Sequence, residues 1–171
     1  MRLLPAFCGL AALALAQSAA AVTVGPVSYS PEFETELHEE LGMREGEYLR
    51  EQVQEAIGAA LARRGLSVDS GGGAIEVVIV DADPNRPTMQ QLADQPSLDF
   101  IRSFSIGGAE LRAVVRGADG QVLTEVDHRR YNSSLAEFHG MPPADTWSEA
   151  RRSIRRFADK VADAYVAHGG R

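Results

Sequence analysis

Apolar side chains recur at helical spacing in two segments of the chain, which predicts two amphipathic helices, each with one stripe to bury. In the first segment the apolar positions are Leu49, Val53, Ala56, Ile57, Ala60 and Leu61. In the second they are Ala150, Ile154, Phe157, Ala158, Val161, Ala162 and Tyr165. Gly65 ends the first helix, because glycine readily adopts the left-handed conformation that follows a helix C-terminus. The run Thr146-Trp147-Ser148-Glu149 has capping-box spacing, which predicts Thr146 as the N-cap of the second helix.

Runs of β-branched and other apolar residues predict the strands. Residues 74–80 are apolar almost without interruption, which is typical of a central strand covered on both faces. Gly25-Pro26 interrupts the first strand and favours an edge position or a bulge there. Asp119-Gly120 forms the tip of a hairpin turn over residues 117–120. The predicted strands are residues 22–29, residues 74–80, one bent or two separate strands over 104–106 and 110–116, and residues 121–131.

Three connections complete the order of elements. Residues 30–46 alternate apolar residues with glutamates like a strand and also space apolar residues like a helix, so we treat this segment as an acidic connection. The glycine run at residues 70–73 predicts a turn. Thr88 and Gln91 have capping-box spacing and begin a short helix, which ends before Pro96.

The order of these elements predicts an α+β fold. Two amphipathic helices on one face of a mixed sheet of four or five strands bury both helical stripes in a two-layer sandwich. The first strand, the first long helix and the apolar strand are expected to form a right-handed crossover, and the hairpin supplies the antiparallel part.

The N-terminal residues 1–21 have the pattern of a cleavable export signal. Arg2 supplies the positive start, residues 3–16 an apolar core, and Ala19-x-Ala21 small side chains for cleavage before Val22. An uncleaved anchor is the alternative, although Pro5, Gly9, Gln17 and Ser18 interrupt the apolar run. We expect a periplasmic or secreted protein whose residues 22–171 form a single domain without a membrane span. Cys8 is the only cysteine, so this domain contains no disulfide.

Charge is unevenly distributed along the chain. The formal net charge is −7 and becomes −8 once Arg2 is removed, which disfavours nucleic acid as a partner. The front of the domain is acidic, with Glu32, Glu34, Glu36, Glu39, Glu40, Glu45, Glu47, Glu51 and Glu55. The last helix is basic, with Arg151, Arg152, Arg155, Arg156 and Lys160. Solvated faces that pair with one another are one interpretation, and a binding role for the basic face is the other.

Two carboxylates, Asp81 and Asp83, follow the apolar strand and suggest a site for a hard cation. Their placement resembles that in phosphatases of the haloacid dehalogenase type, which implies a small metal-dependent hydrolase. The continuation Pro84-Asn85 departs from the phosphatase pattern, and Lys160 is the only lysine. A structural turn is therefore the competing interpretation.

The segment from Asp83 to Gly108 is unusually long and rich in proline and glycine for a plain connection. Long ordered loops often carry binding sites. Arg86 and Arg102 are suited to grip a carboxylate or phosphate, unless they pair within the loop with Asp99 or Asp83. The candidate binding residues are Asp83, Asn85, Arg86, Arg102 and Ser105.

The export signal, the strand–helix–strand order ending in aspartate, the hairpin and the Trp147-bearing terminal helix resemble small uncharacterised secreted α+β domains of bacterial envelopes. The order is also distantly similar to that of the amino-terminal domain of the TolB translocation protein. Our leading hypothesis is a non-enzymatic periplasmic domain, without a cofactor, that binds an envelope protein or cell-wall component. The binding surface is expected to be the loop from Asp83 to Gly108 or an edge of the sheet. The alternatives are the metal-dependent hydrolase and a small-ligand carrier, which requires a deep apolar pocket.

Overall fold

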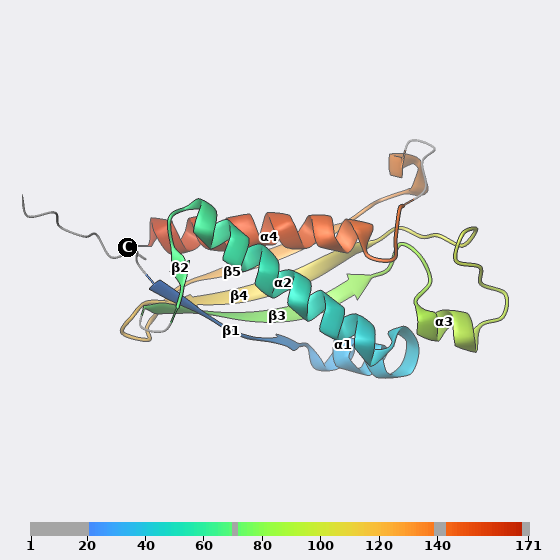
Figure 1. Cartoon of the computed structure of the whole chain (residues 1–171), viewed down its shortest axis with the longest axis horizontal. Helices are drawn as coiled ribbons and strands as arrows, with labels where there is room; N and C mark the ends of the chain where they lie inside the picture. Colours follow the sequence, from blue (N-terminus) through green and yellow to red (C-terminus); the bar gives the residue numbers. More distant parts are fainter. Residues whose placement is uncertain (1–20, 70–71, 139–142, 169–171) are drawn as a thin grey trace, which may run out of the picture.

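A five-stranded mixed sheet forms one layer of the molecule, and two long helices cover one of its faces (Figure 1). The computed structural model describes residues 21–69, 72–138 and 143–168. The strands are β1 (Ala21–Tyr29), β2 (Ser67–Val68), β3 (Gly73–Asp83), β4 (Gly108–Arg116) and β5 (Val122–Tyr131). The helices are α1 (Pro31–Glu36), a π-helical turn (Leu37–Leu41), α2 (Met43–Arg63), α3 (Met89–Asp94), a 3-10 turn (Leu135–Phe138) and α4 (Ser148–Ala167). The predicted α+β two-layer class is confirmed.

The sheet has the order β2-β1-β3-β4-β5, so β3 lies in the middle and β5 at one edge. Strand β1 runs parallel to β2 and β3, whereas β4 is antiparallel to both β3 and β5. The turn between β4 and β5 lies where Asp119-Gly120 predicts it, with Gly120 at a φ of 79°. The α2 helix ends as Gly65 predicts, with Gly65 at a φ of 74°.

The core lies between one face of the sheet and the stripes of α2 and α4. Strand β3 buries alternate positions, Ile75, Val77 and Ile79, while Val78 on the opposite face is only half-buried. The prediction that β3 is covered on both faces is therefore wrong. Both long helices pack on the same side, and the open side carries three cross-strand ion pairs. These are Glu76–Arg116, Glu110–Arg129 and Arg112–Asp127.

The acidic segment 30–46 is helical rather than a plain connection. Ser30 caps α1, since its hydroxyl accepts a hydrogen bond from the Phe33 amide at 3.1 Å. Phe33, Leu37 and Leu41 are all buried. Their helical spacing places all three side chains in the core, which the alternative strand-like pattern does not do.

Two local predictions concern helix starts, and only one of them is correct. Thr88 and Gln91 form the predicted capping box of α3, with bonds of 3.2 Å and 3.1 Å between each side chain and the other's amide. Thr146 does not cap α4, which begins at Ser148. Instead, the Asp145 carboxylate accepts a hydrogen bond from the Trp147 amide at 3.0 Å.

Other sequence predictions lie outside the described residues or are not matched by them. The predicted signal segment, including Cys8, lies outside them apart from Ala21, which begins β1. Part of the glycine turn at residues 70–73 also lies outside them. Residues 104–106 have no regular structure, because the loop bonds them to Asn85 and Pro84 rather than to a strand. Within the described parts of the chain, no helix has the length and apolarity needed to cross a membrane.

Candidate binding site on the 84–107 loop

The connection from β3 to β4, residues 84–107, extends past the end of the sheet and carries α3 (Figure 1). We call it the anchored loop, because its own side chains bond to its irregular backbone and to backbone groups at and just before the start of α4. Every candidate binding residue identified in the sequence lies on this loop or, in the case of Asp83, directly before it.

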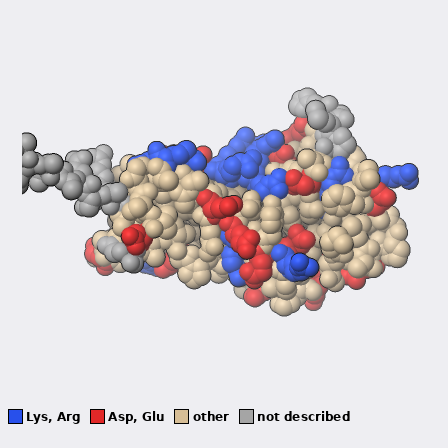
Figure 2. Space-filling view, viewed as in Figure 1, with Lys and Arg blue, Asp and Glu red and all other residues tan. Residues whose placement is uncertain are grey.

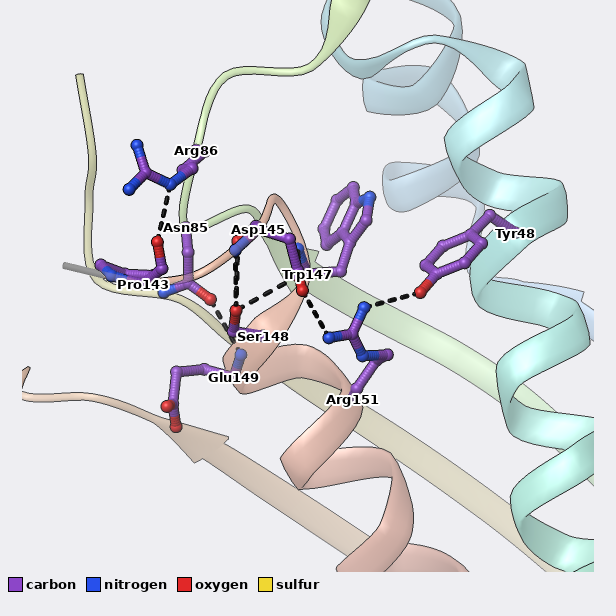
Figure 3. Close-up of polar contacts among 9 residues, drawn as sticks. All are labelled: Tyr48, Asn85, Arg86, Pro143, Asp145, Trp147, Ser148, Glu149 and Arg151. Atoms are coloured by element: carbon purple, nitrogen blue, oxygen red, sulfur yellow. Dashed lines mark hydrogen bonds and ion pairs between the residues drawn. The ribbon is translucent and has the colours of Figure 1, made fainter. Parts of the chain in front are cut away.

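Asn85 joins the anchored loop to the start of α4 (Figure 3). Its side chain is fully buried. The carboxamide oxygen accepts a hydrogen bond from the Glu149 amide at 2.8 Å, and the carboxamide nitrogen donates to the Ser105 carbonyl at 3.3 Å. Its own amide donates to the Thr146 carbonyl at 2.6 Å. Asn85 therefore caps a helix that begins far along the chain, and its polar groups are used inside the protein.

Arg86 holds the far side of the same loop. Its Nε donates to the Pro143 carbonyl at 2.7 Å (Figure 3), and Nη1 donates to the carbonyls of Phe100 and Ile101 at 2.6 Å and 2.9 Å. The guanidinium also lies over the Phe100 ring, 5.6 Å from its centroid. The partners are thus backbone carbonyls and a ring, not the aspartates considered from the sequence.

Ser105 and Asp99 complete the anchoring. The Ser105 hydroxyl donates to the Pro84 carbonyl at 2.6 Å, and its amide donates to the Asn85 carbonyl at 2.9 Å. Asp99 accepts hydrogen bonds from the amides of Ile101 and Arg102, both at 2.8 Å. The Arg102 side chain is exposed and forms no ion pair with a described residue.

A second network, which the sequence did not indicate, joins the start of α4 to α2 (Figure 3). Arg151 donates to the Asp145 carboxylate at 2.6 Å and to the Tyr48 hydroxyl at 2.8 Å. The Trp147 indole donates to the Glu45 carboxylate at 2.6 Å. Burial disfavours the charged form of Asp145, but bonds from Arg151 and the Trp147 amide outweigh it and lower the pKa of this carboxyl. These partners are distant in sequence, so no local pattern indicated them.

The anchored loop, α1 and the π-helical turn border a hollow of about 490 Å³, which we call the acidic hollow. Its charged lining residues are Glu36, Glu40, Asp83 and Arg86, and its large apolar ones are Leu41, Leu98, Phe104 and Ile106. Acidic side chains are as prominent as apolar ones, so it is not the deep apolar pocket that a small-ligand carrier requires.

Negative charges at the hollow interact unfavourably with one another. Burial and the nearby charges of Asp81, Asp83 and Glu40 raise the pKa of Glu36 to about 7. Burial and Asp81 also raise the pKa of Asp83, against the opposing effect of Arg129. Among the described residues that line the hollow, Arg86 is the one basic residue. The site therefore favours a ligand that brings positive charge.

Asp81 and Asp83 lie within the C-terminal end of β3, which continues beyond the predicted strand of residues 74–80. The Asp81 carboxylate accepts a hydrogen bond from the Tyr131 hydroxyl at 2.5 Å. Burial and this hydrogen bond raise the pKa of Tyr131, so the phenol stays protonated as the donor. Across the described residues, no group of three or more His, Cys, Asp or Glu side chains is placed to hold a metal ion.

Exposed apolar side chains gather on the anchored loop. Met89 and Ile101 are 74% and 77% exposed, and Phe100, Phe104 and Ile106 are also exposed. Apolar residues in a proline- and glycine-rich segment were a visible signal in the sequence, but the pattern alone does not show whether such residues turn inward. The structure turns them outward.

Comparison with solved structures finds three similar chains, one of which is a bacterial lipoprotein. No protein-family model matches the sequence, and no curated protein matches it. A crystal structure of a minor lipoprotein from Acinetobacter baumannii aligns with 86% of this chain and 93% of its own, at 8% identity and a TM-score of 0.40. Similarity at this level says nothing about what the protein binds.

Proposed function

We propose that this protein is an exported, non-enzymatic domain of a bacterial envelope that binds a partner protein through the anchored loop. The export part rests on the signal pattern of residues 1–21. The binding part rests on one observation: a loop held by hydrogen bonds of the buried Asn85 and of Arg86 presents exposed apolar side chains beside an acidic hollow.

Anchoring supports binding because order in a free loop lowers the entropy lost when a partner docks. Ordering irregular backbone costs conformational entropy, which burial of Asn85 and the bonds of Arg86 offset. Leaving an apolar side chain such as Ile101 in water costs free energy that burial against a partner would recover. Clusters of such side chains on a monomer typically mark an interaction surface.

The lining of the acidic hollow indicates the chemistry of the partner segment. Phe104 and Ile106 offer apolar contact, while Glu36 and Asp83 are carboxyl groups that repel neighbouring carboxylates and are suited to a positively charged partner. A segment that carries a lysine or arginine next to apolar side chains satisfies both features. The proposed partner is therefore a protein with a basic and apolar segment.

Site-specific photocrosslinking in intact cells tests the proposal. A photoreactive residue replaces Ile101 on the loop or, as the matched control, Val122, which is 50% exposed at the far end of the sheet. We expect a discrete adduct from position 101 at several times the yield of any adduct from position 122. Equal yields, or no adduct from position 101, contradict the proposal.

The acidic hollow is tested in the same background. Glu36→Gln with Asp83→Asn removes two negative charges from the hollow, and Glu51→Gln with Glu55→Gln removes two exposed charges from α2. The first pair is expected to lower the adduct yield at least fivefold, and the second less than twofold. Equal effects mean that the hollow has no specific role in recognition.

A further inference from the structure

A row of basic side chains lies along one flank of α4. Arg152, Arg156 and Lys160 are four residues apart, so they line up on one side of the helix. That side faces edge strand β5, since the Lys160 Nζ lies 3.1 Å from the Nδ1 of His128. Figure 2 shows Lys and Arg side chains gathered along the upper edge of the molecule, where α4 lies, whereas Asp and Glu gather over α2.

His128 marks the centre of this cluster. It is 8% exposed, and its ring stacks on Phe157 with centroids 6.4 Å apart. Burial and the charges of Lys160, Arg156 and Arg130 lower the pKa of His128. The neutral imidazole can therefore accept a hydrogen bond from Lys160 while three cations converge around it.

The cluster has fewer ion pairs than the opposite flank of α4 among the described residues. No ion pair with a described residue neutralises Arg130, Arg156 or Lys160, although the Glu149 carboxylate pairs with Arg152 at 2.8 Å. Hydrogen bonds from Ser133 and, to a smaller extent, the charge of Arg130 lower the pKa of the exposed Glu137 carboxyl.

Two buried nitrogen atoms of the cluster around His128 form no hydrogen bond with a described residue. Among the described residues, the Nε of Arg130 and the Nε2 of His128 are buried without a hydrogen-bond partner. Buried polar atoms are nearly always bonded, and each exception needs an explanation.

The opposite flank of α4 shows that the cluster is not a general property of this helix. Facing α2, Asp159 pairs with Arg63 at 2.9 Å, and Asp163 pairs with Arg64 at 2.7 Å. Arg151 pairs with Asp145 at 2.6 Å. One flank is thus internally neutralised, and the other is left positive.

We infer that Arg130, Arg156 and Lys160, arranged around His128, bind a phosphate group. Guanidinium and ammonium donors that converge from a helix and a strand suit an oxyanion with several acceptor oxygens. The phosphate belongs either to a soluble ligand or to the headgroup of an anionic lipid. The site lies on a different surface from the anchored loop, so it does not depend on the proposed partner protein.

Titration of the purified protein with inorganic phosphate, at constant pH and ionic strength, tests the inference by NMR. We expect saturable shifts centred on His128 and on the facing residues of α4. Arg156→Gln with Lys160→Gln changes exposed side chains, so circular dichroism should show an intact fold, and phosphate binding should weaken at least tenfold. The control, Arg44→Gln with Arg155→Gln, also removes two exposed positive charges and is expected to weaken binding less than twofold.

Cosedimentation with vesicles identifies the source of the phosphate. Binding to phosphatidylglycerol vesicles but not to phosphatidylcholine vesicles, lost in the Arg156/Lys160 variant, supports a lipid headgroup. Saturable binding of inorganic phosphate without vesicle binding supports a soluble phosphate ligand. The absence of both, or equal losses in the two double variants, overturns the inference.

Discussion

Strand β4 is entered and left by two connections of opposite character. The anchored loop that leads into it depends on Asn85 and Arg86, whose partners come from distant parts of the chain. The turn that follows, residues 117–120, is closed by its own neighbours, with the Gly117 amide donating to the Gln121 carbonyl at 2.9 Å. Two antiparallel strands can be joined by a short turn such as residues 117–120. The longer, externally anchored connection thus exceeds what the sheet requires, which is why we assign the binding role to it.

Replacing Asn85 should have the largest effect, because it breaks the loop's attachment to α4. Asn85→Ala removes the side-chain partner of the buried Glu149 amide and of the Ser105 carbonyl. We expect the free energy of unfolding in urea to fall by about 2–4 kcal/mol. The exposed amide change Gln54→Ala serves as the control and should alter it by less than about 0.5 kcal/mol. Similar losses in both variants would remove the distinction between the two connections.

The raised pKa of Glu36 in the acidic hollow predicts a smaller effect on stability, which depends on pH. The pKa of Glu36 is raised from 4.5 to about 7 in the folded protein, so the folded state binds more protons than the unfolded state between these values. Stability from this group is therefore full below 4.5 and falls as the pH rises through 7. Above that pH, Glu36→Gln should be more stable than the parent by about 1–2 kcal/mol, a figure reduced for solvent screening.

Urea denaturation across this pH range checks the prediction. The difference between Glu36→Gln and the parent should shrink towards zero as the pH falls below 4.5. The same substitution at Glu125, exposed on β5 away from the hollow, should give no comparable pH dependence. A constant difference at every pH would mean that the charge of Glu36 is not its cause.

Substitutions in the hairpin turn should have the smallest effect on stability, because they disturb only the turn itself. Gly120 has a φ of 79°, and the space that a Cβ atom would occupy there is open, so Gly120→Ala costs only backbone strain. We expect a loss of about 1 kcal/mol in the free energy of unfolding. Gly120→Asn should lose about half as much, since asparagine tolerates this conformation better. Hydrogen exchange in the anchored loop should not change in either variant.

The sequence predicted the position of the loop but not the contacts of its residues. The length of the Asp83 to Gly108 segment and its glycines and prolines indicated a functional loop. Asn85, Arg86 and Ser105 looked like ligand-binding residues because their side chains are polar. In the folded chain their polar atoms bond to Glu149, Pro143 and Pro84, so they hold the loop in place. Their partners come from other segments, and no spacing rule connects them.

The sequence by itself determined what depends on neighbours along the chain. The stripe from Leu49 to Leu61 specifies a helix, Thr88 and Gln91 cap the next one, and Asp119-Gly120 closes the hairpin. Each of these features is satisfied within a few residues, so local pattern suffices.

The tertiary structure alone decided the features that are stabilised by contacts between residues far apart in the sequence. Burial of Leu37 and Leu41 selected a helix for the acidic segment, and packing of both long helices on one side left Val78 half-exposed. Asn85 replaced the local capping box of α4, because a buried carboxamide reaches the Glu149 amide from across the fold. The position of Lys160 beside His128 likewise arose when α4 packed on β5, since the two residues belong to separate elements that meet only in the folded protein.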